Sequence, residues 1–262
     1  MTPDALASEL LAMVHDAIVG QPRSQQKRIG PSEVGHPCDR RIGYRLAGVD
    51  PVNDRGVAWK PFVGTAVHEL IGNAIGKAEV ARMQDHDFRP RFRVEDRLLV
   101  GSIGGEDIHG SCDLFDEQHG AVWDWKFTTR NKIREEYRPH GPGQQYRVQA
   151  HLYGRGWQLL GYDVQSVGVI FLTRDGEFTD RHVWHEPYDQ DVAIEALQRA
   201  DSIASAIEAL GPDFTLPTLP TAAAYCRFCP WFSQGSTDIP RSCAGHPQEQ
   251  LEAPTLTQLI GA

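Results

Sequence analysis

Asp124 and Lys126 lie two residues apart in the segment AVWDWKF, residues 121–127, in which aromatic residues alternate with other side chains. The alternation predicts a β-strand, where side chains two positions apart share a face. Asp124, Lys126 and Val122 therefore share one face, and we expect the opposite, aromatic face to be the core face. The charged pair is either a solvated ion pair or a metal-binding carboxylate beside a catalytic amine.

A second carboxylate, Asp113 in the segment GSCDLF, precedes this strand by a short interval. If Asp113 lies on the neighbouring strand, the two carboxylates form an acidic pocket suited to Mg²⁺ or Mn²⁺, which prefer oxygen ligands. Such a cation polarises a phosphoryl oxygen, and a lysine beside it stabilises charge that develops in the transition state. His68, in GTAVHE, is a candidate third ligand, although a lone helical histidine is more often structural.

Gln149 and Tyr153 are four residues apart in YRVQAHLYGRGW. On a helix this spacing places both side chains on one face. They are either part of an ordinary helix surface or a polar pair that faces the site and contacts nucleic acid or Lys126.

The five cysteines suggest a second site. Cys226 and Cys229 have the two-residue spacing of metal ligands, Cys243 follows them, and Cys38 lies far upstream. These four residues would form a site that ties the two ends of the chain together, suited to Zn²⁺ or to an iron–sulfur cluster. Cys112 alternates with Asp113, so we expect it to be a buried free thiol.

The remaining pattern predicts the elements that must position these residues. We expect three sequence segments: an N-terminal helical segment (1–60), a core (61–210) and an irregular cysteine-containing arm (211–262). The expected helices are 2–19, 61–77, 143–160 and 190–210, and the expected strands are 91–100, 106–117, 121–127, 165–173 and 177–185, the second and third forming an antiparallel hairpin. This order predicts an α/β fold with a central mixed sheet flanked by helices.

Composition restricts the class of protein. The chain has 262 residues, is 40% hydrophobic and 23% charged, and has a formal net charge of −9. No apolar run has the length of a membrane span, and the N-terminus lacks the basic residues of a signal peptide, so we expect a cytoplasmic protein. The negative charge argues against a nucleic-acid partner, but basic residues cluster in CDRRIGYR, which contains Arg41, and in TTRNKIR, which contains Arg130.

The ordered series GTAVHE, GSCDLF, DWKF and QAHLY resembles the PD-(D/E)XK nuclease superfamily, and within it the RecB-like exonucleases. The single upstream cysteine and the C-terminal C-x-x-C…C resemble the iron–sulfur branch, which includes the CRISPR-associated adaptation nuclease and phage-encoded relatives. The resemblance covers roughly residues 32–245. Two departures are Cys112, where the family name has proline, and the thirteen residues between Cys229 and Cys243.

The resemblance implies a restriction-endonuclease-like core and a metal-dependent DNA exonuclease of a bacterial or phage-infected cell. His68, Asp113 and Asp124 would bind one Mg²⁺ or Mn²⁺, with the Trp125 backbone carbonyl as a fourth contact, and Lys126 would act at the phosphate. The four outer cysteines would hold a 4Fe-4S cluster, with Zn²⁺ as the alternative. Gln149, Tyr153, Arg41 and Arg130 would support or contact the DNA, and a helicase, recombinase or integrase-type protein is a possible partner.

Two other classes of protein remain open from the sequence. One is a nucleic-acid-binding or recruitment module that keeps the nuclease fold but cleaves little. The other is a structural protein whose fold is stabilised by a zinc site. The presence of the full His68, Asp113, Asp124 and Lys126 set favours the nuclease.

Overall fold

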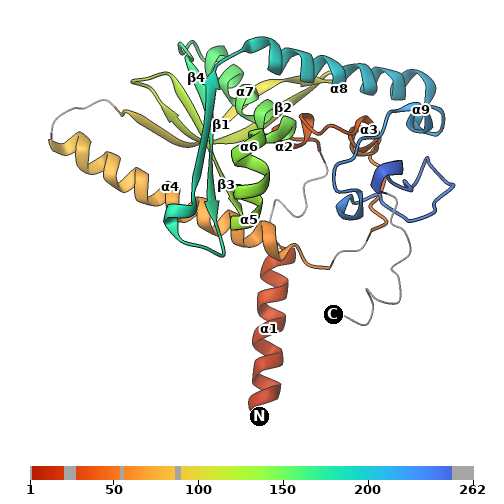
Figure 1. Ribbon diagram of the computed structural model, residues 1–262, viewed down its shortest axis with the longest axis horizontal. Helices are drawn as coiled ribbons and strands as arrows, with labels where there is room; N and C mark the ends of the chain where they lie inside the picture. The colour runs from red at the N-terminus through yellow and green to blue at the C-terminus, as the bar shows by residue number, and fades with distance from the viewer. Residues whose placement is uncertain (1, 21–27, 54–55, 86–89, 250–262) are drawn as a thin grey trace. The chain divides into compact units, whose positions relative to one another are not determined.

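The computed structural model describes residues 2–20, 28–53, 56–85 and 90–249. The chain divides into two compact units, Met1–Gly35 with Val57–Arg199 and His36–Gly56 with Ala200–Ala262 (Figure 1). These bounds differ from the expected segment borders at 60 and 210, because the second unit combines an early segment with the C-terminal part of the chain. The final stretch of the expected arm, 250–262, lies outside the described residues.

A five-stranded mixed sheet forms the centre of the first unit, which confirms the predicted α/β class (Figure 1). The strands are β1 (Phe92–Ile103), β2 (Glu106–Asp116), β3 (Ala121–Thr128), β4 (Ser166–Thr173) and β5 (His182–Pro187), in that spatial order. The β2–β3 pair is antiparallel, as predicted for a hairpin, and β3 and β4 are parallel. Residues 178–180 form a 3₁₀ turn, so the last strand begins later than expected.

Besides the strands, the chain forms the helices α1 (Pro3–Val19), α2 (Pro31–Val34), α4 (Trp59–Asp85), α5 (Arg130–Lys132), α6 (Arg138–His140), α7 (Gly143–Leu159) and α8 (Gln190–Leu210), with a π-helical turn at Ile133–Tyr137. Helices α1, α4, α7 and α8 match the predicted ones, α4 being longer than expected, whereas the short helices were not predicted. Among the described residues, no helix is long and apolar enough to cross a bilayer.

The two faces of β3 differ from the expectation drawn from its aromatic residues. Val122 and Asp124, on the charged face, are 0% and 2% exposed, whereas Trp123 and Trp125 are only half-buried. Aromatic content therefore does not mark the core face of this strand, because the charged face is the one that lines a cavity beneath other elements. The Asp124–Lys126 face is thus the more deeply buried one.

Helix α7 packs closely on the sheet. The Trp157 ring stacks on Phe115 of β2 with a centroid distance of 4.4 Å, and a side chain at Gly156 would collide with Leu98. His151 is fully buried: its Nε2 lies 2.6 Å from Glu186 of β5, and its Nδ1 accepts a hydrogen bond from the Asp189 amide. Burial lowers the pKa of His151, although Glu186 opposes this effect. These contacts fix the helix face that carries Gln149 and Tyr153.

Helix α4 is tied to β1 by the buried carboxylate of Glu79. It accepts two hydrogen bonds from the guanidinium of Arg82, at 2.7 and 3.0 Å, and further bonds from the amides of Arg91 and Phe92. The hydrogen bonds from Arg82 lower the pKa of Glu79 to about 2, against the opposing effect of burial. This anchor holds the helix that carries His68 against the first strand.

The second unit has a small core of its own. It contains α3 (Asp39–Leu46), α9 (Pro212–Thr218) and two 3₁₀ turns, Cys226–Phe228 and Pro247–Glu249. Tyr44, Leu216, Trp231 and Cys243 pack together, with the rings of Tyr44 and Trp231 stacked at 5.5 Å. The expected irregular arm therefore includes one helix, which starts with a proline whose fixed φ suits the first helical position.

Candidate active site

One cavity of the first unit brings together the site residues predicted from four separate motifs. Its volume is about 440 Å³. The predicted residues that line it are His68, Asp113, Asp124, Lys126, Gln149 and Tyr153. They come from α4, β2, β3 and α7, so the antiparallel hairpin and the two packed helices create the arrangement.

Asp113 is 7% exposed and is held in place on two sides. Its Oδ2 accepts a 2.8 Å hydrogen bond from the Trp125 backbone amide and lies 3.2 Å from Nδ1 of His68. Burial tends to lower the pKa of His68, but the hydrogen bond and charge of Asp113 raise it above its ordinary value. A histidine and a carboxylate at this separation are a plausible pair of cation ligands.

Asp124 and Lys126 form an ion pair at the wall of the cavity, between Oδ2 and Nζ. Burial raises the pKa of the Asp124 carboxyl, and the ammonium of Lys126 acts in the opposite direction. Burial also tends to lower the pKa of Lys126, but the carboxylates of Asp124 and Asp113 outweigh it and raise the pKa. The exposed fractions of the two side chains, 2% and 16%, exclude the solvated ion pair considered from the sequence.

Three side chains from α7 surround this ion pair and the neighbouring cavity: Tyr146, Gln149 and Tyr153. Lys126 Nζ lies 5.0 Å from the centre of the Tyr146 ring, within cation–π distance. Gln149, which is 5% exposed, donates a 3.3 Å hydrogen bond from Nε2 to the Tyr153 hydroxyl. Among the described residues, none provides a hydrogen bond to Gln149 Oε1. A buried acceptor without a hydrogen bond lowers the stability of the fold, unless a ligand or a water molecule donates a hydrogen bond to it.

Glu95 of β1 is a cavity residue that the sequence analysis missed. Its carboxylate, a ring nitrogen of His68 and a carboxylate oxygen of Asp113 all lie within 4.8 Å of one another. Glu95 has a φ of 57°, which is rare for a residue other than glycine, asparagine or aspartate. The surrounding segment RFRVEDRLLV reads as a regular strand, so no pattern in the sequence marked this position.

The two predicted DNA-contacting arginines are not part of this cavity lining. Arg130 is exposed at the start of α5, where its backbone amide donates a 2.7 Å hydrogen bond to Asp175. Arg41 belongs to α3 of the second unit, where it lines the cysteine cavity.

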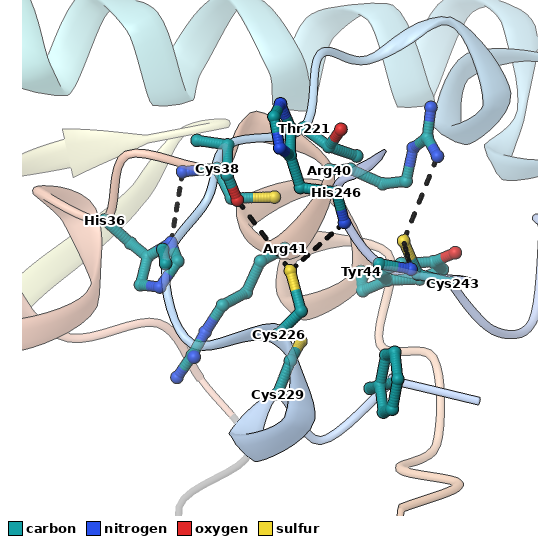
Figure 2. A pocket seen from close by; sticks show the side chains of 14 residues that line it. His36, Cys38, Arg40, Arg41, Tyr44, Thr221, Cys226, Cys229, Cys243 and His246 are labelled. Carbon is teal, nitrogen blue, oxygen red and sulfur yellow. Dashed lines mark hydrogen bonds between the residues drawn. The ribbon is translucent and has the colours of Figure 1, made fainter. Parts of the chain in front are cut away.

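The four predicted cluster cysteines line one small cavity of the second unit, of about 20 Å³ (Figure 2). These residues are Cys38, Cys226, Cys229 and Cys243. Cys38 immediately precedes α3, Cys226 and Cys229 lie at the 3₁₀ turn, and Cys243 lies in the segment that follows it. Cys112 is not among them: it is a buried free thiol, as predicted, and its sulfur accepts a hydrogen bond from Trp157.

Hydrogen-bond donors contact the sulfur atoms of Cys226 and Cys243 in this cavity. The backbone amides of His246 and Gly245 donate to Sγ of Cys226 and Cys243, at 3.2 and 3.4 Å, and Arg40 approaches Cys243 Sγ at 3.9 Å (Figure 2). Burial raises the pKa of Cys229 to about 11, although Arg41 lowers it. Four cysteines in one cavity, with donors directed at the sulfurs of Cys226 and Cys243, fit a thiolate-bound group, because thiolate sulfurs accept hydrogen bonds.

Comparison with known proteins gave matches only among solved structures: no family model and no curated protein matches the chain. A structure of the protein SSO0001 is 14% identical and covers 86% of this chain and 94% of its own, with a TM-score of 0.43. An alkaline exonuclease from Laribacter hongkongensis is 10% identical over 71% of this chain and 91% of its own, with a TM-score of 0.43. A phage-related exonuclease from Haemophilus somnus 129PT is 11% identical over 68% of this chain and 91% of its own, with a TM-score of 0.37.

Proposed function

We propose that the protein is a divalent-metal-dependent DNA exonuclease that hydrolyses phosphodiester bonds in single-stranded or end-containing DNA. The observation that supports this most is the buried Asp124–Lys126 pair, which faces the same cavity as His68 and Asp113. A structural ion pair needs no such cavity, and a cation-binding site beside a buried ammonium suits reactions at phosphate.

The donor set fits Mg²⁺ or Mn²⁺. Carboxylate oxygens from two strands and an imidazole from α4 are ligands that these ions accept, with the imidazole favouring Mn²⁺. His68, Asp113 and Asp124 would hold the ion, with the Trp125 carbonyl as a further contact. The unsatisfied Gln149 Oε1 supports a polar ligand in the same space. When bound, the cation supplies positive charge that polarises a phosphoryl oxygen.

Among the side chains of the site, Lys126 would act directly on the phosphate. Its ammonium, held by Asp124 and by the face of Tyr146, would stabilise the negative charge that grows on the phosphate in the transition state. Gln149 would accept a hydrogen bond from the attacking water or from the substrate. Tyr153 supports Gln149 through their hydrogen bond.

For the second unit we propose a structural 4Fe-4S cluster bound by Cys38, Cys226, Cys229 and Cys243. The support is the shared cavity and the amide donors to Cys226 and Cys243. Hydrogen bonds to cysteine sulfur are one of the means by which proteins tune such clusters. Zn²⁺ bound by the same four thiols is the alternative.

Timed digestion of end-labelled DNA tests the activity. Linear single strands, linear duplexes and circular single strands are incubated with Mn²⁺, with Mg²⁺ or with EDTA, and Lys126→Ala serves as the control. We expect metal-dependent loss of linear substrate from an end and survival of the circle. Binding of DNA with no cleavage under any of these conditions would instead indicate a nuclease-fold binding module.

A further inference from the structure

Glu95 stands within β1 at the position that faces Asp113. The register of the β1–β2 pair passes from Val94↔Leu114 to Asp96↔Cys112, which places Glu95 opposite Asp113. With a φ of 57°, Glu95 adopts a left-handed conformation inside an extended strand. A left-handed backbone raises the free energy of the folded state for any residue with a side chain, but not for glycine. Such strain is often found at functional sites.

This position brings the Glu95 carboxylate close to other candidate ligands. It lies within 4.8 Å of ligand atoms of His68 and Asp113, in the cavity that also contains Gln149. Gln149 provides an independent sign of a ligand, because this side chain is 5% exposed and its Oε1 has no donor among the described residues.

The charges of the cavity favour a cation at this position. The carboxylates of Glu95 and Asp113 lie close to each other on adjacent strands, beside the ring of His68. Two like charges directly opposite each other across a strand pair are destabilising. A divalent cation between them removes that repulsion and accepts both as oxygen ligands.

We propose that Glu95 is a ligand of the divalent cation, together with His68 and Asp113, and that its left-handed backbone serves to direct the carboxylate to the ion. This inference rests on the metal site of the proposed function and adds a ligand to it. The sequence motifs alone assign the site to His68, Asp113 and Asp124.

Mn²⁺ titration of the full chain without DNA tests the proposal. The concentration of free Mn²⁺ is measured by electron paramagnetic resonance. Glu95→Gln should weaken Mn²⁺ binding by at least about tenfold, the range seen when coordination shells are disturbed. Glu69→Gln is the matched control, because Glu69 is an exposed glutamate of α4 that lines the same cavity but does not belong to the ligand set. It should change the affinity much less.

A second variant separates ligand loss from misfolding. Asparagine tolerates the left-handed conformation better than glutamate, so Glu95→Asn should melt in EDTA at the wild-type temperature or above it while Mn²⁺ binding falls. Wild-type Mn²⁺ affinity in Glu95→Gln, or an equal loss in Glu69→Gln, would overturn the proposal.

The same titration separates this inference from the proposed function. If Mn²⁺ binding depends on Glu95 but the protein cleaves no DNA, Glu95 stays a ligand and the proposed nuclease function is rejected. Metal-dependent cleavage in a protein whose Mn²⁺ affinity is unchanged by Glu95→Gln would support the nuclease function and reject Glu95 as a ligand.

Discussion

Asp124 and Lys126 have different expected roles although they form one ion pair. Asp124→Asn should lose Mn²⁺ binding and cleavage together, because it removes a ligand charge. Lys126→Ala should keep the fold and most of the metal affinity but lower the turnover number by about 10²–10³-fold, the usual effect of removing a group that stabilises transition-state charge. Lys126→Arg should not fully restore the rate, because the guanidinium has a different shape and a fixed charge.

Single-turnover cleavage and Mn²⁺ titration on the same preparations check these variants, and circular dichroism confirms that each is folded. Full activity in Lys126→Ala would contradict the catalytic assignment. Equal loss of metal affinity in both variants would mean that Lys126 acts only through Asp124.

Tyr146 is expected to position Lys126 through its ring rather than its hydroxyl group. The ammonium lies 5.0 Å from the ring centre. A cation–π contact of about 1–2 kcal/mol corresponds to roughly a tenfold change in rate. Tyr146→Phe should therefore cleave at close to the wild-type rate, whereas Tyr146→Leu should lose about tenfold in turnover number at an unchanged Michaelis constant. Steady-state kinetics check this, and equal losses in both variants would contradict it.

At the residue scale, sequence patterns located His68, Asp113, Asp124 and Lys126 in one cavity but did not locate Glu95. The first four stand in short motifs whose order is itself informative. The position of Glu95 depends on a backbone dihedral angle inside a strand of ordinary composition, and a periodicity of two cannot reveal a left-handed residue.

At the scale of elements, the Glu79 carboxylate is expected to make the α4–β1 contact sensitive to acid. Its pKa is lowered from 4.5 to about 2, so its contribution to stability is complete above about pH 4.5 and is lost as the pH falls toward 2. Glu79→Gln should lower the free energy of unfolding at neutral pH by about 1–3 kcal/mol, because buried hydrogen bonds from Arg82 and the β1 amides are weakened.

Urea unfolding of wild type and Glu79→Gln at several pH values checks this prediction. The difference between the two proteins should shrink as the pH is lowered from about 5 to about 3. Glu69→Gln, which changes an exposed glutamate of the same helix, should follow the wild-type curve. If the difference in free energy of unfolding between wild type and Glu79→Gln does not depend on pH, protonation of Glu79 does not affect stability.

The elements were mostly predictable, and the exceptions have physical reasons. The helices and the β2–β3 hairpin follow from apolar periodicity and from a short turn, which are local properties. The parallel pairing of β3 with β4 and the burial of the charged β3 face depend on contacts between distant segments. For this reason the aromatic pattern of β3 predicts its aromatic face as the core face, whereas the charged face is the more buried one.

At the scale of the whole molecule, the cysteines are expected to stabilise the second unit. Cys38 is 188 positions from Cys226, and a group bound to both closes a loop that restricts the unfolded chain. Substitution of Cys38, Cys226 or Cys229 by serine should lower solubility and melting temperature first, with activity falling as a consequence. Cys112→Ser should retain the bound metal.

Iron and acid-labile sulfide analysis of these variants decides the chemistry. Iron and sulfide in equal amounts in wild type and Cys112→Ser, with loss in Cys38→Ser, would support the cluster. Zinc without sulfide would keep the four-cysteine site and replace its occupant. Unchanged metal content in Cys38→Ser would remove Cys38 from the site.

The stacking of Tyr44 on Trp231 has a consequence for synthesis on the ribosome. Residues 36–56 emerge early, but their partners in the second unit follow the entire sheet of the first unit. Because domains fold as their residues emerge, the sheet with its cavity can form while Tyr44 and Cys38 still lack their partners. A polypeptide released before Cys226 would carry the candidate catalytic residues but no cysteine unit. Assembly of that unit therefore requires translation to have passed the catalytic region.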